Sequence, residues 1–284
     1  MGAVAAVSAA LAAASAAAEV ADPPPPIQRL AVDGVEAMRA DAGATPRDRR
    51  ALFIGNSFTY GANVPATAGA LLRAAPGGDP RWRTAMIAIG GARLSETSRR
   101  RWVQAHLSAT KPGVLVLQPH SLSALDAEGR AASSAGAAAL ANLAGGAQAP
   151  MRIVLFEPWP RAPGHPLYAQ PGRPSAPAAM AARIRGFLDA RARALGAELA
   201  PVGAAFLAAA AAAPETRLHH ADRYHAGPAG AYLAAAVLAR RIGGRSVAAA
   251  AHDGGLAPSL ARRLRAQADA AVAAEDRAAA ARAR

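Results

Sequence analysis

The chain has 284 residues, of which 52% are apolar and 4% aromatic, so it can bury a full core built mostly of Ala, Leu and Val. The formal net charge is +13, but the basic residues are almost all Arg, they are scattered, and few aromatic residues lie between them. This pattern favours a biased composition over specific nucleic-acid binding, and the lack of Cys excludes disulfides, thiolate metal sites and a Cys nucleophile.

Residues 1–26 form an Ala-rich and then Pro-rich segment ahead of the expected folded domain. Its apolar run at 3–18, with small residues at Ala16-Ala17-Ala18, is typical of a signal peptide and favours a periplasmic or secreted protein. The first basic residue is Arg29, however, so the usual positive start is missing and a plain Ala-rich tail or an upstream start are alternatives. If the Ala-rich segment is not a signal, the protein would be cytoplasmic. We expect no membrane span in the mature chain.

Short apolar segments alternate with helical ones over residues 27–272, which predicts one α/β domain with a parallel sheet covered on both faces. The tail from 257 carries apolar residues on one helical face, so its first half should pack on the domain, whereas 273–284 is expected to be frayed. The expected elements are helix 27–40, strand 51–54, helix 65–74, strand 83–89, helix 95–107, strand 114–117, helix 131–143, strand 152–156, helix 178–195, strand 198–202, helix 208–213 and helix 230–242.

Four noteworthy segments follow directly after expected strands, at 55–61, 90–91, 118–121 and 158–160. Ligands of parallel sheets gather at the carboxyl ends of the strands, so we expect a site there. The long Pro- and Gly-rich loop at 158–177 begins at this edge, and loops of that length are often functional.

Ser57 follows Gly55-Asn56 after the first strand, and Asp222 lies three residues before His225. In that order Ser, Asp and His supply a nucleophile, an orienting carboxylate and a base, which is the chemistry of acyl transfer. Alternatively, Ser57 is a helix N-cap and the Asp222–His225 segment is a surface turn. A metal site in the cluster His219-His220-Ala221-Asp222-x-x-His225 is a further alternative, but no regular ligand spacing is present.

Gly55-Asn56-Ser57-Phe58-Thr59 after a first strand, with Asp222-x-x-His225 near the C-terminus, resembles the SGNH (GDSL-like) hydrolase superfamily. The stretches 52–65 and 225–235 resemble a bacterial branch of it, and the resemblance spans residues 50–245. It implies a flavodoxin-like three-layer α/β/α sandwich with a five-stranded parallel sheet, and hydrolysis of esters of varied alcohols and sugars without a metal or an organic cofactor.

By this resemblance Ser57 would be the nucleophile, His225 the base and Asp222 the residue that holds the imidazole tautomer. The N–H groups of Ser57 and Gly91 would form an oxyanion hole. A third donor in the superfamily is usually an Asn, but this chain has Gln118 at the equivalent place. Gln118 would take that role or satisfy local backbone, and the loss of one such donor typically costs about 2.7–4 kcal/mol in the transition state.

Trp159 and Arg161 begin the long loop after the fourth strand. Trp159 would line the cleft and stack on a sugar or acyl group, or else cap the sheet edge, and Arg161 would meet an anionic substrate. His120, Tyr60 and Asn63 are placed similarly.

The sequence thus predicts a serine esterase that acts on a small-molecule or glycan ester. By analogy alone the narrower expectation is a carbohydrate acetyl ester. An O-acyltransferase with the same triad and a non-catalytic glycan-binding domain are the alternatives.

Overall fold

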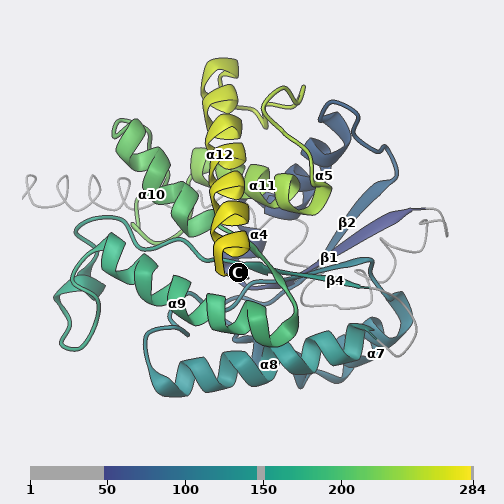
Figure 1. The fold of residues 1–284 in the computed structure, drawn as a ribbon. Helices are drawn as coiled ribbons and strands as arrows, with labels where there is room; N and C mark the ends of the chain where they lie inside the picture. Colours follow the sequence, from purple (N-terminus) through teal and green to yellow (C-terminus); the bar gives the residue numbers. More distant parts are fainter. Residues whose placement is uncertain (1–47, 146–150, 283–284) are drawn as a thin grey trace, which may run out of the picture.

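A five-stranded parallel sheet lies at the centre of the computed structural model, which describes residues 48–145 and 151–282. The strand order is β2-β1-β3-β4-β5, and helices cover both faces (Figure 1), which confirms the predicted three-layer α/β fold. The chain order reverses between β1 and β3, and the carboxyl ends at such a point form the usual binding crevice of these sheets. The strands are β1 (Arg49–Gly55), β2 (Trp82–Ala88), β3 (Val114–Leu117), β4 (Arg152–Phe156) and β5 (Glu198–Ala200).

The helices divide into two groups (Figure 1), with α5, α10, α11 and α12 on one face of the sheet and α7, α8 and α9 on the other. No helix among the described residues is long and apolar enough to cross a membrane. The helices are α4 (Ser57–Tyr60), the 3-10 helix η1 (Gly61–Asn63), α5 (Val64–Ala74), α6 (Leu94–Ser98), α7 (Arg101–Thr110), α8 (Ala127–Gly145), the 3-10 helix η2 (Pro166–Ala169), α9 (Pro177–Leu195), α10 (Val202–Ala212), α11 (Pro228–Gly243) and α12 (Pro258–Arg282).

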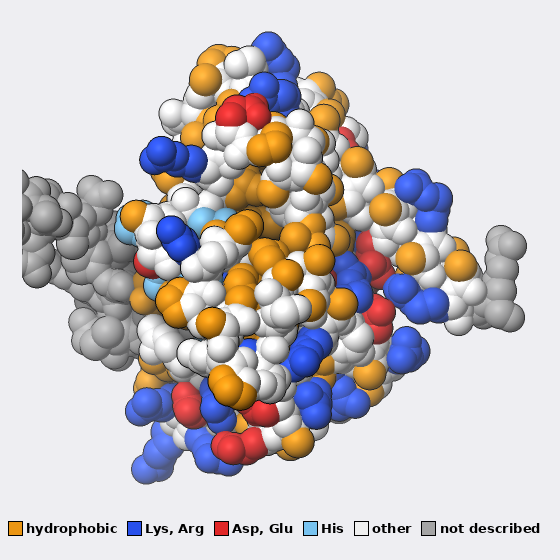
Figure 2. Space-filling view, turned by 90° about the vertical axis from the view of Figure 1, so that its left-hand side faces the viewer, with side chains coloured by type: hydrophobic (Ala, Val, Ile, Leu, Met, Phe, Trp, Pro, Cys, Tyr) orange, Lys and Arg blue, Asp and Glu red, His pale blue; other side chains and the backbone are white. Residues whose placement is uncertain are grey.

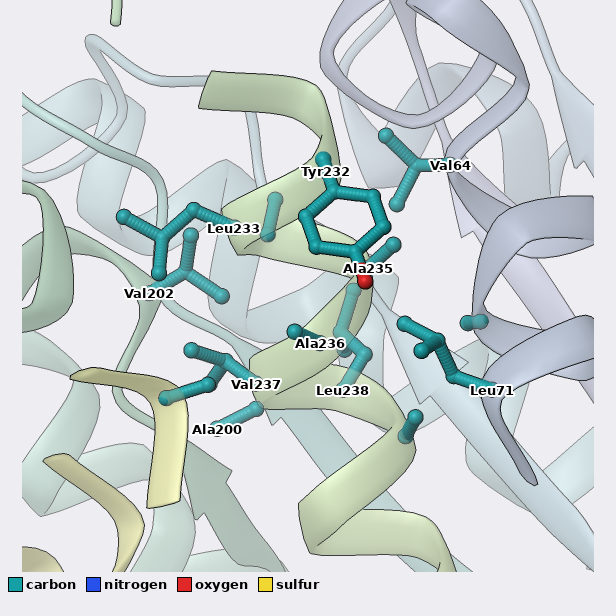
Figure 3. Packing of buried hydrophobic residues seen from close by; sticks show 14 of the residues in the cluster. Val64, Leu71, Ala200, Val202, Tyr232, Leu233, Ala235, Ala236, Val237 and Leu238 are labelled. Carbon is teal, nitrogen blue, oxygen red and sulfur yellow. The ribbon is translucent and has the colours of Figure 1, made fainter. Parts of the chain in front are cut away.

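Side chains alternate along the buried strands, so each strand contributes to two separate cores. Phe53 and Val116 belong to the core beneath α11, whereas Leu52 and Leu115 belong to the core beneath α8 and α9. Helix α11 is buried on nearly all sides, and its many Ala residues allow close packing against α5, α10 and α12. In Figure 3, side chains of α11 extend toward both α5 and α10.

The predicted helix 95–107 is wrong in one respect, because the structure divides it into α6 and α7. Arg100 between them has an extended backbone, and the carbonyl of Ser98 accepts a hydrogen bond from Gln104 Nε2 at 2.9 Å instead of continuing the helix. The fifth strand is shorter than predicted, since Pro201 precedes α10. The predicted helix 27–40 and the segment 1–26 lie outside the described residues.

The C-terminal part differs from the expectation of a frayed end after residue 272. Helix α12 continues to Arg282, and Glu275 within it is buried. Glu275 forms ion pairs with Arg185 of α9 and, at 2.6 Å, with Arg282. The pair with Arg185 ties the end of α12 to α9, which the apolar pattern of the sequence alone does not reveal.

On the face shown in Figure 2, Lys and Arg side chains lie at several separate places around the rim. Asp and Glu side chains lie among them along the lower edge, and hydrophobic side chains occupy much of the centre. The positive charge on this face is therefore dispersed.

Candidate active site

The turn after β1 presents Ser57 at the reversal point of the sheet. Asn56 caps the following helix, since its Oδ1 accepts a hydrogen bond from Phe58 N–H at 3.2 Å. Its Nδ2 donates to the carbonyl of Ala92 at 3.1 Å, so the same side chain ties the turn to the loop after β2. Ser57 is the first residue of α4 and is partly exposed.

Gln118 lies under this turn and fixes it. Its Oε1 accepts hydrogen bonds from Asn56 N–H at 2.9 Å and from the Thr59 hydroxyl at 3.1 Å. Its Nε2 donates to the carbonyl of Pro119 at 2.5 Å, and the residue is only 1% exposed. Gly55 is required here, because a Cβ would lie 2.2 Å from Thr59 Oγ1 and 2.6 Å from Gln118 Oε1. The predicted oxyanion role of Gln118 is therefore corrected to the alternative, a residue that supports the turn.

Residues 218–227, between α10 and α11, form a loop closed by its own backbone. Gly227 N–H donates to the carbonyl of Leu218 at 2.9 Å, and His220 N–H donates to the carbonyl of His225 at 2.8 Å. This closure holds the backbone of His225 on the same small unit as Asp222.

Asp222 is the hydrogen-bond acceptor at the centre of this loop. Its Oδ1 accepts from the N–H groups of Tyr224 at 2.8 Å and His225 at 2.9 Å. Burial opposes the charge of Asp222, but the hydrogen bond from the His225 ring and these two N–H groups lower its pKa to about 2. Asp222 is thus a carboxylate that can only accept, so the nearest ring nitrogen of His225 carries a proton.

Ser57, Asp222 and His225 meet in one hydrogen-bonded line. His225 Nδ1 lies 2.7 Å from Asp222 Oδ2, and His225 Nε2 lies 3.0 Å from Ser57 Oγ. Because Nδ1 donates to Asp222, Nε2 is the free acceptor and the Ser57 hydroxyl donates to it. Residues 168 positions apart in the sequence are therefore arranged so that the imidazole can remove the proton of the hydroxyl.

Gly91 lies in the exposed turn after β2, with φ of +69°. A Cβ at Gly91 would meet nothing within 4 Å, so open space adjoins it. Within the described part of the chain, the N–H groups of Gly91 and Ser57 have no hydrogen-bond partner. The hydrogen bond from Asn56 to Ala92 holds the turn after β1 beside the turn after β2. The unpartnered N–H groups of Ser57 and Gly91 are therefore candidate donors to an oxyanion.

Trp159 is part of the core and does not line a cleft. It is 1% exposed and stacks between Phe58, with ring centroids 4.0 Å apart, and Phe206, at 4.8 Å. Its Nε1–H donates to the carbonyl of Tyr224 at 3.0 Å. The predicted stacking on a sugar or acyl group is therefore wrong, because both faces of the indole are covered by protein.

Arg161 lies beside the loop that carries His225. Its guanidinium carbon is 3.6 Å from the centre of the Tyr224 ring, and the residue is 4% exposed. His120, which follows β3, is partly exposed, and its Nδ1 accepts a hydrogen bond from Leu122 N–H at 3.3 Å. Burial and the nearby charge of Arg161 lower the pKa of His120, so it is neutral at physiological pH.

His219, which precedes Asp222, contacts the backbone of another segment. His219 Nε2 lies 2.9 Å from the carbonyl of Pro160, which links the loop to the segment after β4. In residues 48–145 and 151–282, no group of three or more His, Asp and Glu is arranged to hold a metal ion.

Sequence reasoning missed the contribution of Asn56, Phe58 and Tyr224. The position of Tyr224 inside Asp222-x-x-His225 was a usable signal, because its backbone must take part in the turn. The stacking of Phe58 on Trp159 joins residues far apart in sequence, and no local pattern indicates it.

No family model matches the chain, and no curated protein matches it. A solved structure of a candidate SGNH hydrolase from Slackia heliotrinireducens is similar at 28% identity and a TM-score of 0.54, over 69% of this chain and 100% of that one. A DUF4886-family protein from Bacteroides uniformis is similar at 18% identity and a TM-score of 0.65, over 79% and 94% of the two chains. A lipase/acylhydrolase from Enterococcus faecalis is similar at 15% identity and a TM-score of 0.53, over 69% and 96%. The last two show a shared fold.

Proposed function

The chain belongs to the SGNH hydrolase superfamily and is an ester hydrolase, and from this premise we propose that it cleaves a carboxylic ester through an acyl-enzyme on Ser57. One observation carries the proposal. The continuous pair of hydrogen bonds from Ser57 through His225 to Asp222, at 3.0 and 2.7 Å, provides a nucleophile with an oriented base.

In the first step Ser57 Oγ attacks the ester carbonyl carbon, and its proton passes to Nε2 of His225. Asp222 stays ionised and stabilises the imidazolium, because its pKa of about 2 prevents it from taking the proton itself. The N–H groups of Ser57 and Gly91 donate to the oxyanion of the tetrahedral adduct.

The adduct then breaks the bond between the carbonyl carbon and the alcohol oxygen. His225 returns its proton to that oxygen, so a neutral alcohol leaves and the acyl group stays on Ser57. A water molecule repeats the sequence: it attacks the acyl carbon, gives a proton to His225, and releases the carboxylic acid as Ser57 regains its proton. No metal or organic cofactor takes part in this scheme.

Hydrolysis of 4-nitrophenyl esters from acetate to octanoate by the wild type and by Ser57→Ala tests the proposal. We expect Ser57→Ala to lower kcat by at least about 10³-fold, since the nucleophile is lost. Ser108→Ala changes an exposed hydroxyl on α7 and serves as the matched control with full activity. A fluorophosphonate should label the wild type at Ser57. Equal hydrolysis by the wild type and Ser57→Ala would exclude the assignment.

We also propose that the protein is exported, because the Ala-rich residues 3–18 are typical of a signal peptide. Expression of the full chain with separation of periplasm and cytoplasm, followed by N-terminal sequencing, tests it. A mature protein that begins after residue 18 is the expected result, and an uncut cytoplasmic chain would contradict it.

As substrate we propose a small-molecule or glycan ester, with an acetylated carbohydrate as the first to assay.

A further inference from the structure

Arg161 is a buried cation without an acidic partner. It is 4% exposed, and it forms no ion pair within residues 48–145 and 151–282. Its Nε and Nη1 are enclosed and have no hydrogen-bond partner in the described part of the chain. By contrast, the buried Arg265 pairs with Asp253 at 2.9 Å and also donates to Tyr232.

Burial of a guanidinium without a partner is unfavourable, because its N–H groups lose their water and gain nothing in return. The Tyr224 ring compensates in part, since the guanidinium carbon of Arg161 lies 3.6 Å from the ring centre. This contact still leaves Nε and Nη1 of Arg161 without a hydrogen-bond partner among the described residues. A bound anion would supply the acceptor that these N–H groups lack.

The residues around Arg161 do not provide that anion. The nearby His120, His165 and His219 each have a lowered pKa, with burial the main cause and the Arg161 charge contributing, so these rings are neutral. Asp222 is the acidic group that acts on Arg161, but it already accepts two backbone N–H groups and the His225 ring N–H.

Arg161 also lies one ring away from both halves of the triad. The Tyr224 ring on which it stacks has its centre 4.0 Å from that of His225. The guanidinium carbon is also 5.7 Å from the centre of the Phe58 ring, and Phe58 follows Ser57 directly. Arg161 therefore lies near the residues that adjoin both the base and the nucleophile.

We propose that Arg161 is a specificity residue that binds a carboxylate carried by the ester substrate, close to the bond that is cleaved. The proposal rests on the ester hydrolase function above and names its substrate class: anionic esters. Because Nε and Nη1 are enclosed in this structure, a side chain beside Arg161 must shift when the carboxylate binds. The guanidinium would then gain the charge-assisted hydrogen bonds that it lacks.

The test compares esters that differ only in this charge. For a carboxylate on the acyl side, the pair is 4-nitrophenyl hemisuccinate and 4-nitrophenyl methyl succinate. For the alcohol side, the pair is 4-acetoxyphenylacetic acid and its methyl ester. The readout is the ratio of kcat/KM for the acid over its methyl ester, measured within each protein so that a general loss of activity cancels.

We expect the wild type to favour the acid of at least one pair by about tenfold or more, mainly through KM. Arg161→Gln should abolish the preference and Arg161→Lys should keep part of it, whereas Arg193→Gln, an exposed change on α9, should keep it in full. If Arg161→Gln does not fold, Arg161→Lys and competitive inhibition of the wild type by phenylacetate, compared with phenylacetamide, decide the matter.

A wild type that hydrolyses both methyl esters as fast as the acids would overturn the proposal and leave the hydrolase function intact. A preference that survives in Arg161→Gln would likewise overturn it, and Arg161 would then be a support for Tyr224 only. No hydrolysis of any of the four esters, together with no labelling of Ser57 by a fluorophosphonate, would contradict the proposed function itself.

Discussion

The indole N–H of Trp159 donates a hydrogen bond to the carbonyl oxygen of Tyr224 at 3.0 Å. This bond joins the segment after β4 to the loop that holds His225. The same indole stacks on Phe58, the neighbour of Ser57, with ring planes 4° apart. One buried side chain therefore contacts the backbone next to the base and the side chain next to the nucleophile.

Trp159→Phe keeps most of the stacking and removes the N–H, so the Tyr224 carbonyl loses its partner. We expect kcat for 4-nitrophenyl acetate to fall about 3–10-fold with little change in KM, since one hydrogen bond contributes about 1 kcal/mol to the position of His225. Trp102→Phe on α7, remote from the loop, is the matched control. A change in KM alone, or no change in kcat, would argue against this positioning role.

Asp222→Asn replaces a carboxylate that is ionised above about pH 2 with a neutral amide of the same shape. The His225 ring then loses the acceptor that fixes its tautomer, and kcat should fall about 10³–10⁴-fold.

In the wild type, the carboxylate of Asp222 keeps its charge throughout the assay range. Ionisation of Asp222 should therefore not appear on the acid side of the kcat/KM profile above pH 3. A step between pH 3 and 5 that is absent from Asp222→Asn would contradict this.

Glu157 lies directly after β4 and is 1% exposed. Burial raises its pKa to about 7. The guanidinium of Arg185 at 2.9 Å and the N–H of Ala204 oppose this shift, because they favour the charged carboxylate. In the unfolded chain the Glu157 carboxyl loses its proton near pH 4.5, whereas in the folded protein it keeps the proton up to about pH 7. Raising the pH from 4.5 to 7 therefore stabilises the unfolded state relative to the folded state and lowers the free energy of unfolding. Glu157→Gln lacks this ionisable group and serves as the reference.

We expect the free energy of unfolding of the wild type, relative to Glu157→Gln, to fall by up to about 3 kcal/mol between pH 4.5 and 8. Urea denaturation at three pH values measures it. Glu128→Gln, at an exposed position on α8, is the matched control. A constant difference between the wild type and Glu157→Gln would mean that Glu157 is ionised in the folded protein across this range.

Gly136 of α8 packs against the start of α6, where a Cβ would lie 2.2 Å from Ser95 N and 2.4 Å from the carbonyl carbon of Leu94. Gly136→Ala must push the two helices apart and should destabilise the protein by about 1–3 kcal/mol. Gly186 of α9 has open space around a Cβ, so Gly186→Ala should stabilise by up to about 1 kcal/mol. Thermal unfolding measures the Tm of both variants. A lower Tm for Gly136→Ala and a higher Tm for Gly186→Ala would confirm the two predictions, and equal changes in Tm would contradict them.

The sequence predicted the strands Val114–Leu117 and Arg152–Phe156 to the residue, because both are short runs dominated by apolar side chains. It also predicted which three side chains would meet at the sheet edge. The functions given to Gln118 and Trp159 were wrong for a physical reason. Their partners come from neighbouring strands and distant loops, and only the fold decides whether a polar side chain faces a cleft or supports a turn.

Asp222 and His225 belong to one loop that is closed by its own hydrogen bonds, whereas Ser57 begins the short helix α4 directly after the central strand β1. Any motion between these two bodies carries the acid and the base together. Such a motion would change the 3.0 Å separation of Ser57 Oγ and His225 Nε2 and leave the Asp–His hydrogen bond intact.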